Sequence, residues 1–265
     1  MTVPVFYSIS DDFTKYAAVS LNSLVKHANP ETDYTVYFLN QDLSSQHKQD
    51  LSDLGIQNVY VKFFHIDDDI AKLYNTELGN NLFGACTDSS IQYVAKMVKY
   101  IKDVLALDPK KYINSGMLVM NSKAFRDEHF INHFMNLLER YHFDCIAPDQ
   151  DYLNEIGEGR ILHLDPRWDA MPNENTKPLK NPGLIHYNLF FKPWHFKNVQ
   201  YEDYFWQSAK ETKFYNELKA ELNNYTDAER ADDREKLNHI LLKEDKTEQD
   251  PNNWARVKER EAVKL

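Results

Sequence analysis

The sequence predicts an α/β fold, and two observations support this prediction. Short apolar runs of strand length alternate with longer segments whose apolar residues recur at helical spacing. Polar residues follow the first of these runs directly, as they do where a parallel strand delivers its carboxyl end to a ligand crevice. The chain contains no GxGxxG and no GxxxxGKS/T pattern, so a nucleotide would be held without either of the common glycine-rich phosphate loops.

The composition argues against several classes of protein. The 265 residues are 42% hydrophobic and carry a formal net charge of -10, which lacks the basic surplus that binding to a nucleic-acid backbone needs. Cys86 and Cys145 each stand alone in an apolar setting and are expected to be reduced core thiols. No apolar run approaches the roughly 20 residues of a spanning helix. We therefore expect a cytoplasmic protein with at most weak peripheral contact to the inner face of a membrane.

The first 75 residues predict strands and helices in alternation. Residues 3–9 form an apolar strand pattern that ends at Ser10, and apolar residues then recur at helical spacing, with Asp11 or Asp12 as the helix cap. The next predicted elements are a strand at 34–39, a helix from Ser44 to near Gly55, a strand at 59–66 and a short helix at 70–74. This order predicts a parallel sheet with right-handed crossovers.

Residues 111–121 form the segment around which we expect a site to be organised. The apolar run at 117–120 predicts a short buried strand, and Asn114 and Gly116 stand immediately before it. Glycine permits a close approach of the backbone, so such a corner can bring an amide and bare backbone near a ligand. The alternative is a strand that begins with ordinary turn residues.

The rest of the chain continues the α/β pattern and then becomes helical. We expect strands at 82–86, 161–164 and 184–187 and helices at 91–107 and 125–138. Beyond Tyr201 the pattern is helical, and beyond Lys219 it is dense in charge, which predicts a docked helix followed by disorder. In this tail Trp254, with the basic residues Arg256, Lys258 and Arg260, could touch a membrane surface weakly.

Two clusters of polar residues suggest chemistry. Asp67, Asp68 and Asp69 follow the strand predicted at 59–66 and could hold a hard divalent cation, since such cations prefer oxygen ligands. The alternative is a solvated cap for the helix at 70–74. Asp149, Gln150 and Asp151 form a second polar cluster.

Five motifs occur in an order typical of one family. They are Ile9-Ser-Asp-Asp12, Tyr112-Ile-Asn-Ser-Gly116, Pro148-Asp-Gln-Asp151 with Leu153-Asn154, Asp165-Pro-Arg-Trp168, and Ile185-His-Tyr187 with Lys192-Pro-Trp194. With them the chain resembles family 8 of the retaining glycosyltransferases, which includes bacterial lipopolysaccharide galactosyl- and glucosyltransferases and, more distantly, glycogenin. The resemblance implies a GT-A type fold, a Rossmann-like mixed sheet with flanking helices, over residues 1–206, followed by a helical, charge-rich extension at 207–265.

The resemblance also implies a reaction and roles for particular residues. The reaction is transfer of a hexose from a UDP-sugar, with Mn²⁺ or Mg²⁺, to a glycan or glycolipid acceptor, as in lipopolysaccharide biosynthesis. The implied positions are Ile9, Ser10 and Asp11 at the uridine, Asn114 and Gly116 at the donor sugar, Asp149 and Gln150 as catalytic groups beside the anomeric carbon, His186 as a metal ligand and Lys192 at the diphosphate.

The chain departs from the family pattern in one place. The family's Asp-x-Asp metal motif is missing from this register, and the domain is shortened near residues 66–70. Asp67 and Asp69 can replace this motif if the strand at 59–66 occupies the position of the family strand that normally ends in Asp-x-Asp. Two alternatives follow: a catalytically inactive relative that binds a glycan or a protein partner, and a metal hydrolase site built from Asp67, Asp69 and His186. No positioned base supports the hydrolase.

Overall fold

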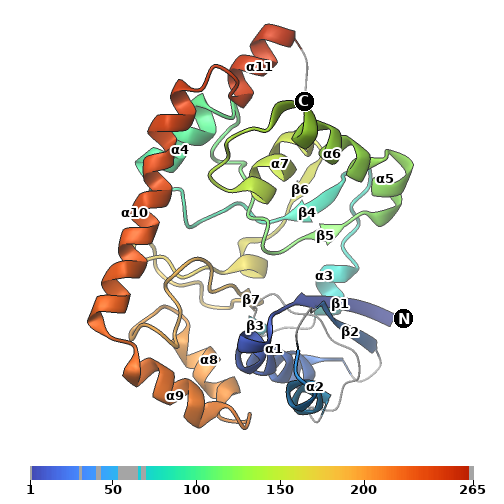
Figure 1. Cartoon of the computed structure of the whole chain (residues 1–265). Helices are drawn as coiled ribbons and strands as arrows, with labels where there is room; N and C mark the ends of the chain where they lie inside the picture. The colour runs from blue at the N-terminus through green and yellow to red at the C-terminus, as the bar shows by residue number, and fades with distance from the viewer. Residues whose placement is uncertain (1, 30–31, 40–42, 53–64, 67–69, 263–265) are drawn as a thin grey trace. The chain divides into compact units, whose positions relative to one another are not determined.

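A computed structural model of the chain describes residues 2–29, 32–39, 43–52, 65–66 and 70–262 (Figure 1). Contacts divide the chain into two compact units. Unit 1 comprises Met1–Thr76 and Arg167–Ala231, and unit 2 comprises Glu77–Pro166 and Asp232–Leu265. Both units combine helices with short sheets, which confirms the predicted α/β class. The domain boundary expected at residue 206 stays a prediction.

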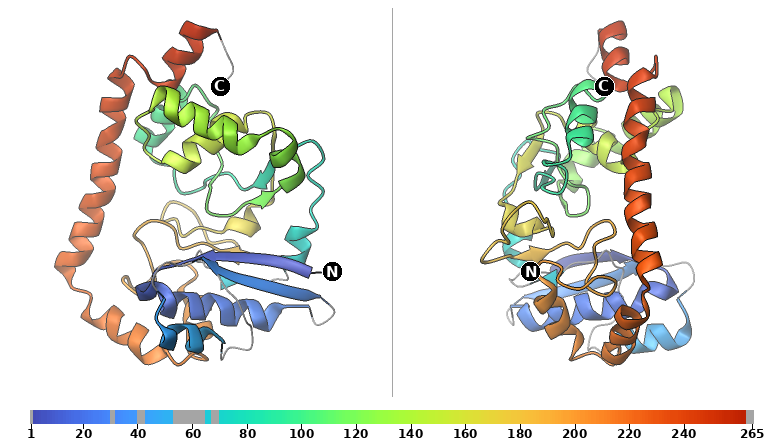
Figure 2. Two further views of the ribbon diagram at one scale, coloured as in Figure 1. Left: turned by 45° about the vertical axis from the view of Figure 1, so that its right-hand side comes forward. Right: turned by 90° about the vertical axis from the view of Figure 1, so that its left-hand side faces the viewer.

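Unit 1 contains a parallel strand pair joined by a helix. Strands β1 (Thr2–Ser8) and β2 (Asp33–Leu39) pair in parallel along their whole length, and helix α1 (Thr14–His27) connects them. Successive side chains of a strand point to opposite faces, so Tyr7 is buried whereas Phe6 is exposed. Helix α1 lies along one face of the pair (Figures 1 and 2). This strand, turn and helix confirm the prediction.

The start of α1 differs from the prediction in its capping. A short turn, η1 (Asp11–Phe13), precedes the helix, and its N-cap residue, Phe13, supplies no capping side chain. The predicted cap by Asp11 or Asp12 is therefore wrong. The Asp11 carboxylate accepts hydrogen bonds from the Ser44 backbone and from His47 instead, just before and within helix α2 (Ser45–Ser52). The predicted end of α2 near Gly55 lies outside the described residues.

The remaining strands of unit 1 pair in the opposite sense. The strand predicted at 59–66 is described only as β3 (His65–Ile66), which pairs antiparallel with β7 (Leu184–Ile185). An all-parallel sheet is therefore the wrong expectation here, because β7 is reached through a loop and not through a crossover helix. Helix α3 (Ile70–Tyr74) forms where it was predicted.

Unit 2 has a three-stranded mixed sheet in the order β5-β4-β6. The central strand β4 (Phe83–Ala85) is fully buried and pairs in parallel with β6 (Ile161–His163) and antiparallel with β5 (Val119–Met120). The run at 117–120 is thus not a buried strand as predicted: only two of its residues form the strand, and Met120 is 53% exposed. The reason is that β5 lies at an edge of the sheet, where one side has no partner strand.

Helices α4 to α7 also belong to unit 2, and three of them correct the predicted bounds. Helix α4 (Ala95–Asp103) is shorter than the predicted 91–107 at both ends, since residues 89–93 form turns and Ala106 has a left-handed φ of 57°. The helix predicted at 125–138 is two helices, α5 (Ser122–Asp127) and α6 (Phe130–Tyr141), separated by the left-handed residue His129 with a φ of 53°. Helix α7 (Pro148–Ile156) begins with proline at its first turn.

The C-terminal part is helical, as predicted, but it does not end in disorder within the described residues. Helices α8 (Glu202–Ala209) and α9 (Tyr215–Asn224) belong to unit 1. The long helix α10 (Asp227–Gln249) begins in the last residues of unit 1 and continues in unit 2, where α11 (Trp254–Glu261) follows it (Figure 2). Trp254 has no exposed surface, so its predicted contact with a membrane is wrong. None of the helices among the described residues is long and apolar enough to cross a membrane.

Candidate functional site

In unit 2 the loop at 112–116 faces the first turns of α7. The backbone N–H of Ser115 donates to Oε1 of Gln150 over 2.9 Å, and the Ser115 hydroxyl donates to Oδ2 of Asp149 over 2.8 Å. The side chain of Asn114 accepts a hydrogen bond from the backbone N–H of Gly116 over 2.8 Å. The four residues expected at the donor sugar, Asn114, Gly116, Asp149 and Gln150, therefore lie together.

A carboxylate that the sequence analysis did not assign joins them. Oδ2 of Asp88 accepts hydrogen bonds from the side-chain amides of Asn114 and of Gln150, each over 3.0 Å. Asp88 is 3% exposed, and its Oδ1 accepts from the backbone and hydroxyl of Ser90. The signal that could have identified Asp88 was present, since it follows the strand predicted at 82–86 in the way that Ser10 and Asp11 follow the first strand.

Two further residues of α7 attach the same loop from within the core. Asn154 accepts from the backbone N–H of Ile113 over 2.8 Å and donates to its carbonyl over 3.0 Å. Asp151 is fully buried and accepts hydrogen bonds from Tyr112, Tyr100 and the backbone N–H of Ala147. Burial raises the pKa of Asp151 to about 6, and the two tyrosine hydroxyls oppose this rise.

The residues expected at the uridine lie in unit 1, at the carboxyl end of β1. Ile9 is buried and Ser10 partly exposed. Oδ1 of Asp11 accepts hydrogen bonds from the backbone N–H of Ser44 over 2.7 Å and from Nδ1 of His47 over 2.8 Å. Both bonds lower the pKa of Asp11 below its usual value, and the bond from the Ser44 backbone has the larger effect. Asp11 is thus an ionised acceptor at a strand end.

His186 and Lys192 also belong to unit 1. His186 follows β7, and its Nδ1 lies 3.0 Å from Oδ1 of Asp169, which is buried. Lys192 donates from Nζ to the carbonyl of Tyr187 over 2.7 Å and lies over the Trp194 ring at 5.5 Å from its centre. The His186 imidazole is thus oriented by a buried carboxylate, whereas the Lys192 ammonium group contacts a backbone carbonyl.

The predicted metal ligands are tested only in part. Asp67 and Asp69 lie outside the described residues, and the residues that are described include no group of three or more His, Cys, Asp or Glu side chains suited to a metal ion. The Asp169 carboxylate lies behind one ring nitrogen of His186, as carboxylates often do behind histidine ligands of metal ions. The roles of His186, Asp67 and Asp69 as metal ligands stay predictions.

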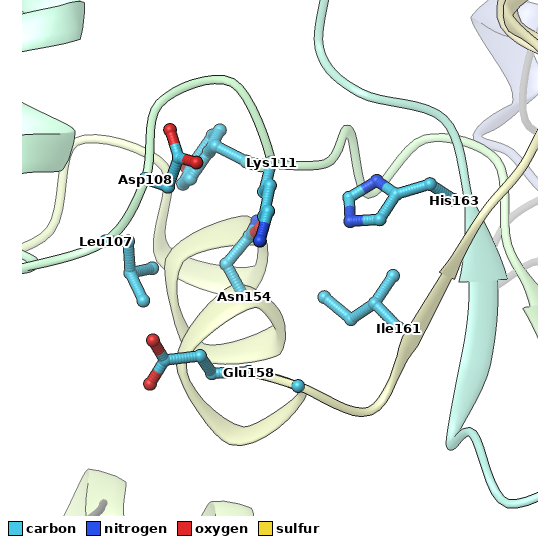
Figure 3. A pocket seen from close by; sticks show the side chains of 9 residues that line it. Leu107, Asp108, Lys111, Asn154, Glu158, Ile161 and His163 are labelled. Carbon is cyan, nitrogen blue, oxygen red and sulfur yellow. The ribbon is translucent and has the colours of Figure 1, made fainter.

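A pocket of about 340 Å³ lies in unit 2 beside this loop and helix, and it contains none of the predicted site residues (Figure 3). Its lining includes Lys111, His163 and Glu158, and the pKa of His163 is lowered by burial and by the charge of Lys111. Tyr112 and Asn154 form part of its wall, but their polar groups bond to Asp151 and Ile113. We therefore place the candidate site at the polar cluster of Asp88, Asn114, Asp149 and Gln150 and not in this pocket.

Comparison with known sequences gives a family and two relatives. Residues 63–198, slightly more than half of the chain, match the profile of glycosyl transferase family 8. A Haemophilus influenzae (strain KW20 / Rd) protein named as a candidate glycosyltransferase is 22% identical over 250 residues, which cover 74% of each chain. General stress protein A of Bacillus subtilis (strain 168) is 22% identical over 165 residues, 56% of each chain.

Comparison with solved structures shows that the chain shares its fold with known glycosyltransferases. The apo structure of the bifunctional glycosyltransferase WbbM has a TM-score of 0.70 at 20% identity, over 83% of this chain and 51% of that one. The galactosyltransferase LgtC, solved in complex with donor and acceptor sugar analogs, has a TM-score of 0.66 at 18% identity, over 80% of this chain and 96% of that one. The chain thus spans about half the length of WbbM and nearly all of the LgtC chain.

Proposed function

The chain belongs to glycosyl transferase family 8, and from this premise we propose that it is a retaining glycosyltransferase that moves a hexose from a UDP-sugar to a glycan or glycolipid acceptor. Its fold is of the GT-A type, as the likeness to WbbM and LgtC shows. The family assignment does not include the identity of the donor, of the acceptor or of the metal ion, and these three belong to the proposal.

The observation that carries the proposal is the polar cluster in unit 2. Asp88 accepts hydrogen bonds from the amides of Asn114 and Gln150 and so fixes their orientations. Asp149 accepts a hydrogen bond from the Ser115 hydroxyl, and the backbone N–H of the same serine donates to Gln150. Carboxylates and amides of this kind can bind sugar hydroxyls. A carboxylate at this position also stabilises the positive charge that develops on the sugar as the leaving group departs. We assign the donor sugar to this cluster, with Asp149 and Gln150 beside the anomeric carbon.

We assign the nucleotide to residues of unit 1. Asp11 is an ionised acceptor that suits ribose hydroxyls, with Ile9 and Ser10 beside it. Lys192 carries its charge on a flexible stem, so its ammonium group can move from the Tyr187 carbonyl to a diphosphate. The stacking of its neighbour Trp194 on Tyr16, at 4.5 Å between ring centres, holds the loop from which this lysine projects.

We assign the divalent cation to His186, with Asp67 and Asp69 as the proposed oxygen ligands. The Asp169 carboxylate orients the His186 imidazole for this role. When bound, the cation would supply positive charge to the departing diphosphate, to which Lys192 also contributes.

Turnover of the donor tests this proposal. UDP release from UDP-galactose and UDP-glucose is measured with Mn²⁺ for the wild type and for Asp88→Asn, Asp149→Asn and His186→Ala. Each change removes a charge or ligand at the proposed site, so we expect turnover to fall by about 100-fold or more. Asp127→Asn is the control, since Asp127 is an exposed carboxylate of the same unit that pairs with Lys123.

Two results would count against the proposal. Unchanged turnover in Asp149→Asn and His186→Ala would show that the assigned roles are wrong. A folded wild type that binds a glycan but releases no UDP from either donor would favour the catalytically inactive relative.

A further inference from the structure

Helix α7 contacts the loop at 112–116 through four side chains, two of which the proposed reaction does not use. Asp149 and Gln150 bond to Ser115 and belong to the proposed site. Asp151 and Asn154 bond to Tyr112 and Ile113 and are buried. The loop is therefore attached to the helix at consecutive residues on both sides of Asn114.

The Asp151 carboxylate is an unusual group to find in this place. It has no exposed surface, and burial of a carboxylate is costly unless hydrogen bonds replace its water. Three donors surround it: the Tyr112 hydroxyl at 2.5 Å, the Tyr100 hydroxyl at 2.8 Å and the Ala147 backbone N–H at 3.1 Å. Through these bonds Asp151 links α7 to helix α4, which carries Tyr100, and to the loop, which carries Tyr112.

The two tyrosines that donate to Asp151 belong to different segments of unit 2. Tyr112 lies two residues before Asn114, in the loop of the candidate site. Tyr100 lies in α4, and its hydroxyl also accepts a hydrogen bond from the backbone N–H of Ile146 over 3.2 Å. Both side chains are at most 1% exposed, so each hydroxyl donates to the same carboxylate in a buried setting.

The loop is also attached on its other side, to the residues that follow β4. The backbone N–H of Asp88 donates to the Tyr112 carbonyl over 2.9 Å, and the N–H of Asn114 donates to the Cys86 carbonyl over 3.0 Å. These bonds fix the loop against residues 86–88, whereas Asn154 and Asp151 fix it against α7. The placement of Asn114 next to Asp88 and Gln150 therefore depends on both sets of bonds.

We propose that Asp151 and Tyr112 form a positioning pair that fixes the 112–116 loop against the start of α7 and so sets the geometry of the donor-sugar site. Neither residue touches the reacting atoms in this account. The effect on turnover rests on the proposed function, whereas the effect on the loop does not. Misplacement of binding groups by a fraction of an ångström is enough to slow a reaction substantially.

The matched variants Tyr112→Phe and Tyr100→Phe test the pair. Tyr100→Phe removes one hydroxyl from Asp151 and also the acceptor of the Ile146 N–H, so we expect its melting temperature to fall at least as much as that of Tyr112→Phe. Only Tyr112→Phe loosens the attachment of the loop to α7, so we expect kcat for UDP release from UDP-galactose or UDP-glucose to fall by about tenfold in this variant and by less than about twofold in Tyr100→Phe. Equal losses in the two variants, or no loss in Tyr112→Phe, would overturn the proposal.

Hydrogen exchange gives a readout that needs no donor. The Ser115 N–H, which donates to Gln150, should exchange with solvent faster in Tyr112→Phe than in Tyr100→Phe, as measured by NMR on the full chain. The same exchange rate in both variants would contradict the positioning pair. If the wild type releases no UDP from either donor, the proposed function fails, and the exchange comparison still decides whether the pair positions the loop.

Discussion

At the scale of single residues, Asp88 determines how the amides of the candidate site are oriented. Its Oδ2 accepts from both Asn114 and Gln150, so the nitrogen of each amide points to the carboxylate. The amide oxygens then accept from the backbone of Gly116 and Ser115. One buried carboxylate thus assigns the donor and acceptor ends of two amides, which is a condition for selective recognition of hydroxyl groups.

The buried carboxylate of Asp151 gives a testable dependence on pH. Burial raises its pKa from 3.8 to about 6, so between these values the native state holds a proton that the unfolded chain has lost. Stability from this group is therefore lost as the pH rises through that window. In Asp151→Asn the loss is absent, so the unfolding free energy of the variant relative to the wild type should rise by about 2–3 kcal/mol from pH 4 to pH 7.

Urea denaturation of both proteins at several pH values checks this expectation. Carboxylates with a lowered pKa, such as Glu128 beside Arg160, give the opposite trend in both proteins and cancel in the difference. A difference that stays constant between pH 4 and pH 7 would show that Asp151 does not titrate in this range.

Part of the cluster in unit 2 could be recognised from the sequence, because small polar residues stood beside apolar segments without a packing reason. The family resemblance implied that Asn114, Asp149 and Gln150 lie at the donor sugar, and the structure shows that the three side chains lie together. Asp88 was missed, although it also follows a strand. The contacts of Asp151 could not be predicted, since they depend on Tyr100, which is 51 residues away in the chain.

At the scale of elements, helix α11 lies in a charge-dense segment and still packs against the core of unit 2. Asn253 caps the helix by accepting from the backbone N–H of Arg256 over 3.0 Å. Lys258 lies 2.5 Å from the buried carboxylate of Glu155 on α7 and also donates to the carbonyl of Leu105. Burial raises the pKa of Glu155 to about 8, and the charge of Lys258 opposes this rise. A C-terminal helix thus contacts the helix that carries Asp149 and Gln150.

The packing of Trp254 gives a prediction about this helix. Its ring stacks on Phe143 at 3.7 Å between centres and meets Tyr152 edge-on at 4.8 Å. Trp254→Ala leaves a cavity, so we expect a loss of about 3–5 kcal/mol in the free energy of unfolding by urea. The control is Glu259→Ala on the exposed face of α11, with an expected change within about 0.5 kcal/mol. A loss below about 1 kcal/mol in Trp254→Ala would show that α11 contributes little to the stability of the unit.

The helices and strands were predictable where their apolar pattern was strong and local. Strand β1 and helices α1 and α3 formed at the expected positions. The break between α5 and α6 was not predictable, because the apolar spacing continues across His129 and only its left-handed backbone ends the pattern. The exposure of β5 depends on its place at an edge of the sheet, which the residues of the strand do not encode.

At the scale of the whole molecule, the residues with proposed roles and the helices beside them are not confined to the segment that matches the family. The family match covers residues 63–198, whereas Asp11 precedes it and α11 follows it. The α/β class was predictable because helices and strands alternate along the chain. The two-unit organisation was not, since each unit combines two separate segments of the sequence.

Calorimetric titration of the full chain with UDP, with and without Mn²⁺, tests the central claim most directly, because it requires no knowledge of the acceptor. The account predicts that UDP binds and that Mn²⁺ tightens this binding, with the metal effect lost in His186→Ala. The absence of UDP binding by a wild type whose fold is confirmed by circular dichroism, in either condition, would contradict the claim that this chain uses a UDP-sugar donor.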